Sequence, residues 1–182
     1  MDTTLTTDRL EISGWTPEDA EAAYGIFGAR EVTHWLTPAM DQVGDVAAMA
    51  SVLRGWQQAQ AGLLTPQGRW AVRRRDNGEV VGGVSIQLLP PFEDDLEVSW
   101  QLRPDAWGHG YASEASAALV EWAFTQDTEE LFAVARPNNV RAIATAKRLG
   151  MLWVGETTKY YDLRLQVFRV RHSDLITGDA TS

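Results

Sequence analysis

One short stretch of the sequence combines residue types that suit the binding of a phosphate group: Trp107-Gly108-His109-Gly110-Tyr111-Ala112. Glycines let the backbone approach a ligand closely and turn its N–H groups outward. A helix that begins here adds unpaired donors and the positive end of its dipole, which together suit a pyrophosphate. The third glycine and the acidic ribose ligand of a dinucleotide-binding fold are missing, as is the Gly-Lys-Ser/Thr ending of a P-loop. Gly-x-Gly turns are common, so this pattern alone does not identify the ligand.

The composition excludes several classes of chemistry. The 182 residues include no cysteine, which excludes disulfides, thiolate metal sites and any mechanism through a cysteine acyl-enzyme. The histidines, His34, His109 and His172, lie far apart without metal-ligand spacing, so we expect no metal site. The formal net charge of −9 argues against a nucleic-acid partner, because binding a phosphate backbone needs a basic face. The acidic surplus suits a cationic acceptor, although acidic charge more commonly serves solubility.

The sequence gives no indication of a membrane span or of export. Asp, Glu, Arg or Gly interrupts every stretch before it reaches the roughly 18 apolar residues of a span. The start, Met-Asp-Thr-Thr-Leu-Thr-Thr-Asp, lacks a basic region followed by an apolar one. We therefore expect a cytoplasmic protein without a membrane partner, as a monomer or a homodimer.

Periodicity predicts the elements that must position the glycine turn. Alternation of apolar and polar residues predicts a strand over 7–15, and Thr16-Pro17 then begins a helix, with threonine as the N-cap. Asp76-Asn77-Gly78 predicts a hairpin turn, because asparagine and glycine tolerate positive φ. The other expected elements are a loop or short turn over 31–42, helices over 43–61, 110–126 and 139–149, and strands over 70–75, 79–89, 96–102, 131–136, 151–158 and 163–171.

The order of these elements predicts the fold class. We expect one α/β (α+β) domain over residues 1–176, with a mixed, mostly antiparallel sheet of about seven strands flanked by about four helices. The strand–helix–strand unit over 96–136 should form a right-handed parallel crossover. Residues 177–182 are expected to form a flexible C-terminal tail.

Two longer motifs resemble a known family. Leu102-Arg-Pro-Asp-Ala-Trp-Gly-His-Gly-Tyr-Ala-Ser-Glu-Ala115 is similar to the coenzyme A pyrophosphate loop of the GNAT N-acetyltransferases, and most to that of their RimJ/RimL-like ribosomal-protein branch. Asn139-Val-Arg-Ala-Ile-Ala-Thr-Ala-Lys-Arg-Leu-Gly-Met151 resembles the helix that follows in this family. The opening Thr7-Asp8-Arg9-Leu10 and the hairpin Trp70…Gly82 also resemble this branch. The resemblance implies a single GNAT domain that transfers the acetyl group of acetyl-coenzyme A (acetyl-CoA) to a primary amine, with no metal.

The resemblance also implies which residues bind acetyl-CoA. Backbone N–H groups of the glycine loop would bind the pyrophosphate. The strand before the loop would part from its neighbour and pair with the pantetheine arm. Asn139 would hydrogen-bond a pantetheine amide or would instead cap its own helix. The implied contacts are Trp100, Gln101, Leu102, Gly108, His109, Gly110, Tyr111, Ala112, Ser113 and Asn139.

Three positions depart from the family's pattern. The first loop position, Arg or Gln in much of the superfamily, is Asp105, which puts an acid beside the expected phosphates. A motif serine is Ala142, and the helix tyrosine that serves as general acid in many members is Ala146. The acid is therefore unassigned. Glu114 matches a family position and is expected to stabilise the first helical turn electrostatically.

Acetyl transfer to an amine needs a neutral nucleophile, a stabilised oxyanion and a proton for the departing thiolate. Without cysteine, direct attack on the thioester is the economical mechanism. We expect a backbone N–H near Leu102 to bind the oxyanion and Glu97, on the same strand, to act as the base; a solvated strand residue is the alternative for Glu97. Tyr160 and Tyr161 are candidate acids, although paired tyrosines at a strand end more often pack.

The acceptor site is harder to define. We expect the first two helices, their connection and the late hairpin to line it, with His34, Trp35 and Trp56 at the substrate and the acidic loop Glu93-Asp94-Asp95 nearby. An acidic rim would favour a cationic amine such as a protein N-terminus, a polyamine or an aminoglycoside, whereas aromatics would favour a flat or apolar group. Two other hypotheses are a non-catalytic acyl-CoA-binding sensor or scaffold and an antibiotic-modifying or toxin-type enzyme.

Overall fold

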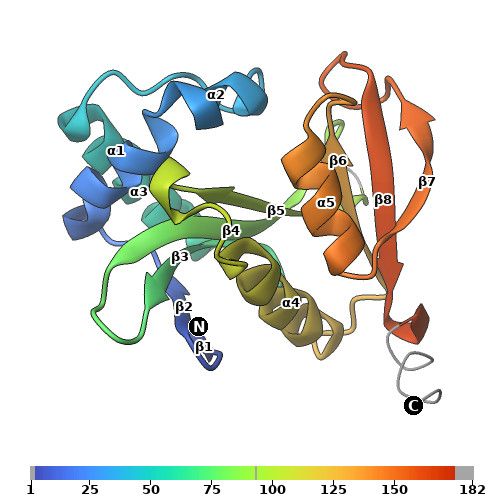
Figure 1. Cartoon of the computed structure of the whole chain (residues 1–182), viewed down its shortest axis with the longest axis horizontal. Coiled ribbons are helices and arrows are strands. Elements are labelled where there is room, and N and C mark those ends of the chain that lie inside the picture. The colour runs from blue at the N-terminus through green and yellow to red at the C-terminus, as the bar shows by residue number, and fades with distance from the viewer. Residues whose placement is uncertain (1–2, 93, 175–182) are drawn as a thin grey trace.

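The computed structural model describes residues 3–92 and 94–174, which form one open sheet with helices on both faces (Figure 1). The strand order is β1-β2-β3-β4-β5-β6-β8-β7, and every neighbouring pair is antiparallel except β5 and β6. The strands are β1 (Leu5–Thr6), β2 (Leu10–Gly14), β3 (Gly68–Arg74), β4 (Val80–Leu88), β5 (Leu96–Leu102), β6 (Glu130–Ala135), β7 (Leu152–Thr157) and β8 (Leu165–Arg171). The helices are α1 (Ala20–Phe27), α2 (Arg30–Leu36), α3 (Val46–Gln60), α4 (Tyr111–Phe124) and α5 (Val140–Arg148), with short 3-10 helices η1 (Pro17–Asp19) and η2 (Pro104–Ala106). The predicted fold class is confirmed.

The sequence pattern located most elements to within a few residues, and one prediction was wrong. β5 spans the predicted residues 96–102, and the turn between β3 and β4 places Gly78 at a φ of 74°. The segment over 31–42 is not simply a loop, because it contains most of α2. This helix has only seven residues and no side-chain N-cap, so the strongest signal of a helix start is absent. β1, with two residues, is likewise too short to show a period.

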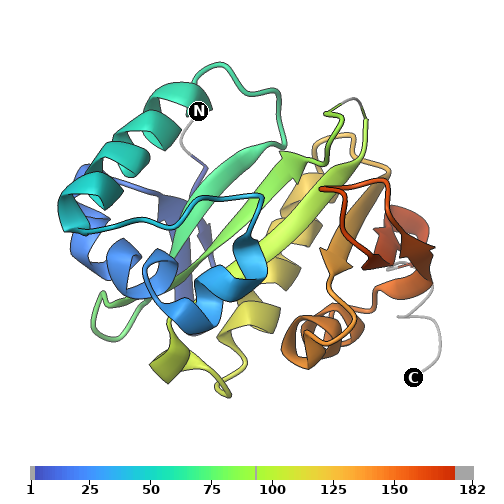
Figure 2. The same cartoon turned by 90° about the horizontal axis from the view of Figure 1, so that it is seen from above.

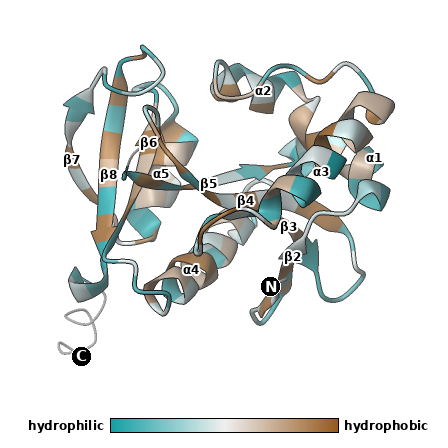
Figure 3. Ribbon diagram, turned by 180° about the vertical axis from the view of Figure 1, so that it is seen from behind, coloured by the Kyte–Doolittle hydropathy of each residue, from teal (hydrophilic) through white to brown (hydrophobic). Residues whose placement is uncertain are grey.

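The two faces of the sheet carry separate cores (Figures 1 and 2). α4 and α5 cover one face, where Leu119 packs with Ile86 and Val98 of the central strands. α1, α2 and α3 cover the other face, where Met49 packs with Ala71 of β3. Figure 3 shows hydrophobic residues along the central strands, as expected for strands that are buried on both faces.

The sheet parts between its two central parallel strands. β5 and β6 share a single register pair, Glu97 with Phe132, and β5 then continues for five residues without a partner on that side. Figure 1 shows the resulting V, with α4 connecting its two sides. The predicted parallel crossover over 96–136 is therefore present, and the unpaired end of β5 leads directly to the glycine turn.

Some predictions lie beyond the described residues. The tail over 177–182 and Glu93 of the acidic loop fall outside them. Among the helices of residues 3–92 and 94–174, none is long and apolar enough to cross a lipid bilayer.

Candidate active site

Two glycines with left-handed backbone conformations shape the glycine turn. Gly108 and Gly110 adopt φ values of 82° and 79°, and α4 begins directly afterwards at Tyr111. A Cβ atom at Gly108 would meet nothing within 4 Å, so its outer side is free for a ligand. The predicted turn is therefore a backbone cradle at a helix N-terminus, the arrangement that binds phosphate groups.

The first strands anchor this turn through a contact that the sequence analysis missed. Arg9 donates from Nε to Glu114 Oε2 at 2.7 Å and from Nη1 to the His109 carbonyl at 3.0 Å. The Thr7 hydroxyl donates to Glu114 Oε1 at 2.5 Å. These hydrogen bonds lower the pKa of Glu114 against the opposing effect of its partial burial. Glu114 thus joins the first turn of α4 to the strand that begins at Leu10.

The acid expected beside the phosphates is neutralised. Asp105 accepts a hydrogen bond from Arg103 Nε at 2.5 Å, and this contact lowers the pKa of Asp105. Arg103 also donates from Nη2 to Glu79 at 2.6 Å. Asp105 does not line the cavity between β5 and β6, so this departure from the family's loop adds no acid to that cavity.

A cavity of about 860 Å³ fills the V between β5 and β6 and reaches the glycine turn. We call it the donor cavity. Arg136, Arg141 and Arg148 line it, against Glu31 and Glu97. This excess of cations is notable in a chain with a net charge of −9, and it suits a ligand with several phosphate groups.

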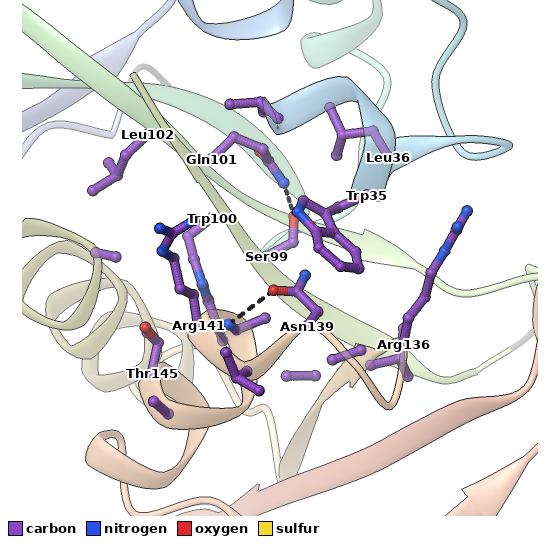
Figure 4. Close-up of a pocket in the computed structure, with 18 of the residues that line it drawn as sticks. Trp35, Leu36, Ser99, Trp100, Gln101, Leu102, Arg136, Asn139, Arg141 and Thr145 are labelled. Atoms are coloured by element: carbon purple, nitrogen blue, oxygen red, sulfur yellow. Dashed lines mark hydrogen bonds between the residues drawn. The ribbon is translucent and has the colours of Figure 1, made fainter. Parts of the chain in front are cut away.

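The side chains of the donor cavity come from both sides of the V (Figure 4). The Trp107 indole donates to the Leu102 carbonyl at 3.0 Å and lies under Arg141, whose guanidinium carbon is 4.2 Å from the ring centroid. Arg136 Nη2 donates to the Thr37 carbonyl at 2.5 Å, which links the end of β6 to the segment after α2. The Arg136 Nε is buried and has no partner among the described residues.

The structure shows one of the two roles predicted for Asn139, the helix cap, and its contact with pantetheine stays a prediction. Its Oδ1 accepts a hydrogen bond from the Ala142 N–H at 3.2 Å, which caps α5. The residue also lines the donor cavity, and its side-chain amide remains available as a donor.

The unpaired edge of β5 presents alternate backbone groups to the donor cavity. The Arg103 N–H donates to the Val81 carbonyl of the neighbouring segment. Because antiparallel hydrogen bonding alternates along a strand, Trp100 and Leu102 direct their N–H and C=O groups away from β4. The Leu102 carbonyl meets the Trp107 indole there. Gln101 directs its backbone toward β4 instead, so it reaches the cavity only through its side chain.

A second cavity of about 240 Å³ lies on the face covered by α1, α2 and α3, and we call it the acceptor cavity. It is lined by three mutually packed aromatic residues, Trp15, Phe27 and Trp56, with ring centroids 5.4–6.3 Å apart. The residues shared by both cavities are Leu36, Ala39, Glu97, Ser99, Gln101 and Tyr161. The cavities therefore meet at β5.

Glu97 lies at this junction with a buried carboxyl group and no counter-ion among the described residues. Burial raises the pKa of its carboxyl to about 8, opposed only by a hydrogen bond with the backbone of Val134. No described cation forms an ion pair with it. A carboxyl group with a pKa near neutrality is matched to general acid–base work.

The structure separates the two neighbouring tyrosines that the sequence left equivalent. The Tyr160 hydroxyl donates to Asp95 at 2.7 Å, and its ring packs with Leu89 outside both cavities. Tyr161 lines both cavities, and burial together with the charge of Glu97 raises its pKa to about 12. Its hydroxyl thus stays protonated at neutral pH and lies near Glu97.

No other tyrosine takes the place of the family's missing phenol. Of the four tyrosines in the sequence, Tyr24 binds the Gly44 carbonyl and Tyr111 belongs to the glycine turn. Ala146, at the family's tyrosine position, is 2% exposed within the core.

The three residues expected at the substrate occupy different places. Trp56 lines the acceptor cavity and Trp35 lines the donor cavity. His34 is exposed and packs edge-on against Trp35, outside both cavities. Of the acidic loop, Asp95 is held by Lys159 and Tyr160 rather than facing a ligand.

Comparisons with known proteins agree with this arrangement. The acetyltransferase (GNAT) domain family matches residues 9–152. The uncharacterized N-acetyltransferase YoaA of Bacillus subtilis is 29% identical over 66% of this chain and 66% of its own length. A GNAT-family acetyltransferase from Bacillus anthracis superposes with a TM-score of 0.78 at 18% identity, over 94% of this chain and 99% of its own.

Two further solved structures share the fold. Ribosomal-protein-S5-alanine acetyltransferase from Vibrio fischeri has a TM-score of 0.74 at 16% identity, over 95% of this chain and 98% of its own. The microcin C7 self-immunity acetyltransferase MccE, in complex with acetyl-CoA and AMP, has a TM-score of 0.73 at 14% identity, over 91% and 93%. The family match covers most of the sequence, so this chain belongs to the GNAT N-acetyltransferases.

Proposed function

We propose that this protein transfers the acetyl group of acetyl-CoA directly to a primary amine at the junction of the two cavities. The observation that carries the proposal is the position of Glu97, which lines both cavities beside the unpaired edge of β5. The donor cavity fits acetyl-CoA because it joins a phosphate cradle, an arginine-rich wall and a free strand edge. A pantetheine arm has amides that can pair with such an edge.

The proposed reaction uses three groups of this chain: a backbone N–H, a carboxylate and a phenol. The amine nitrogen attacks the thioester carbonyl carbon, and the backbone N–H of Trp100 or Leu102 stabilises the oxyanion. Glu97 accepts a proton from the attacking nitrogen. The C–S bond then breaks, the sulfur takes the Tyr161 hydroxyl proton, and Glu97 returns its proton to Tyr161. The products are the N-acetyl amine and coenzyme A, and the enzyme is unchanged.

Two classes of amine are candidates for the acceptor. The loop sequence resembles the RimJ/RimL-like branch, and the Vibrio fischeri neighbour is a ribosomal-protein acetyltransferase, which supports a protein N-terminus. The small, partly aromatic acceptor cavity supports a small-molecule amine. We favour the small molecule because of an arginine, Arg69, that lines the acceptor cavity.

Thiol release from acetyl-CoA, measured against a panel of peptides and small amines, tests the proposal. We expect acetyl-CoA to bind and at least one class of amine to accelerate thiol release. Tight binding without amine-dependent release would instead support the acyl-CoA-binding sensor and would overturn the transferase.

A further inference from the structure

The acceptor cavity contains an arginine, Arg69, without an anionic partner among the described residues. The Arg69 side chain lines the cavity and forms no ion pair and no side-chain hydrogen bond with the rest of the described chain. Its guanidinium carbon lies 5.2 Å from the centroid of the Trp56 ring, and the neutral phenol of Tyr161 is also nearby. Arg73, four residues further along β3 and on the same face, instead holds Asp19 with two hydrogen bonds of 2.9 and 2.7 Å. The chain therefore supplies a carboxylate to the arginine outside the cavity and not to the arginine inside it.

Arg69 is a partly buried cation to which the described chain supplies no counter-ion. Burial lowers the pKa of Arg69, yet a guanidinium remains charged in proteins. Partly buried charges are stabilised by a counter-ion with good hydrogen-bond geometry. The fork of N–H donors matches a carboxylate. A bound acceptor can supply the counter-ion that the chain does not.

The sheet places this cation within reach of the base. Arg69 is paired in register with Ser85 of β4, and Ser85 with Ser99 of β5, so the three residues form one row. Because neighbouring strands lie about 4.8 Å apart, the ends of this row are about 10 Å apart at the backbone. Glu97 follows on the same face of β5, two residues before Ser99. One small molecule can therefore place an anion at Arg69 and an amine near Glu97.

Resting on the proposed function, we propose that the acceptor is a small amine that carries a carboxylate, of amino-acid type, with an apolar or aromatic side chain. Its carboxylate binds Arg69, its side chain packs against Trp15, Phe27 and Trp56, and its amine reaches Glu97. The N–C bond forms as the C–S bond breaks, as in the general reaction. A protein N-terminus does not satisfy Arg69 in this way, because the carboxyl group of its first residue is part of a peptide bond.

Matched pairs of amines test this proposal. The probes are phenylalanine with 2-phenylethylamine, and leucine with isopentylamine; each pair differs only by the carboxylate. We expect the native protein to favour the carboxylate-bearing member by at least about 10-fold in kcat/KM. Arg69→Gln should lower kcat/KM for that member by about 10²-fold and leave the simple amine unchanged. Arg54→Gln, which removes an exposed charge of α3 outside both cavities, should change neither.

Several outcomes would overturn the proposal. An equal loss for both members in Arg69→Gln would assign Arg69 a structural role. Efficient acetylation of peptides or simple amines by the native protein, without dependence on Arg69, would refute the substrate class and leave the transferase proposal standing. Preference for O-phosphoethanolamine over every carboxylate would show that the anion is a phosphate. If Arg69→Gln does not fold, Arg69→Lys keeps the charge but loses the bidentate fork, and the same selective loss is expected at smaller size.

Binding measurements separate this proposal from a failure of the transferase proposal. If no amine is acetylated, calorimetry can still measure the dissociation constant for phenylalanine. Binding by the native protein that weakens about 10²-fold in Arg69→Gln supports the carboxylate site. Absence of binding to the native protein overturns it.

Discussion

The donor and acceptor cavities meet at β5 but are built in different ways. The donor cavity depends mainly on backbone: two left-handed glycines, a helix N-terminus and an unpaired strand edge. The acceptor cavity depends on side chains from β2, α1, α3 and β3, which are distant in sequence. The comparison teaches that one cavity is built mainly from backbone features, which many sequences can supply, whereas the other depends on the particular side chains that this chain carries.

The largest effect is expected at Glu97, the proposed base among the residues common to both cavities. Glu97→Gln should lower kcat by about 10³-fold, the range of a lost general base. Since burial places the pKa of Glu97 at about 8, the native rate should rise as pH increases through about 8. Steady-state kinetics between pH 6 and 10 should show this rise in rate for the native protein and not for the variant. A variant with native turnover across this range would exclude Glu97 as the base.

The next effect separates the two tyrosines. Tyr161→Phe should lower kcat by about 10²-fold with little change in acetyl-CoA affinity, because it removes a proton donor. The matched variant Tyr160→Phe removes the hydrogen bond to Asp95 and should lower the free energy of unfolding by about 1–3 kcal/mol with kcat retained. The opposite pattern would assign the acid to Tyr160.

A smaller effect should be confined to the donor cavity. Gly110→Ala forces an alanine to a φ of 79°, which costs about 1–2 kcal/mol, and should raise the dissociation constant for acetyl-CoA about 10-fold. Gly150→Ala is the control, since its φ of 73° is equally demanding but it lies outside the cavity. The control should lower stability alone, and calorimetric titration distinguishes the two. Equal affinities would show that the turn does not bind acetyl-CoA.

The smallest expected effect is on the thermal stability of Glu97→Gln at high pH. The folded-state pKa of Glu97, about 8, lies above its ordinary value of 4.5, so the protonated form is favoured by folding. This contribution is fully present below pH 4.5 and is lost as pH rises through about 8. Glu97→Gln should therefore have the higher Tm above pH 8, by about 2–4 °C for a stabilisation of about 1 kcal/mol. A higher native Tm at pH 9 would contradict the burial of this charge.

The sequence was informative where local chemistry determines structure. Strand alternation located β5, and the motif from Leu102 to Ala115 located the donor cavity, because glycine conformations and helix starts leave local signals. The short α2 left none. Arg69 and Arg9 were also missed, since their significance depends on the strand register, which brings them beside residues far along the chain. No local pattern distinguishes the unpaired Arg69 from the paired Arg73.

The free edge of β5 has a consequence for the solution behaviour of the protein. An exposed strand edge with unpaired N–H and C=O groups is a template on which other chains can add. Here that edge lies within a cavity, between the segment after α2 and the start of α5, and the hydrogen bond from Arg136 to Thr37 links its two sides. These walls restrict the approach of a second polypeptide strand to the edge. An edge that lies inside a cavity is therefore protected from edge-to-edge aggregation.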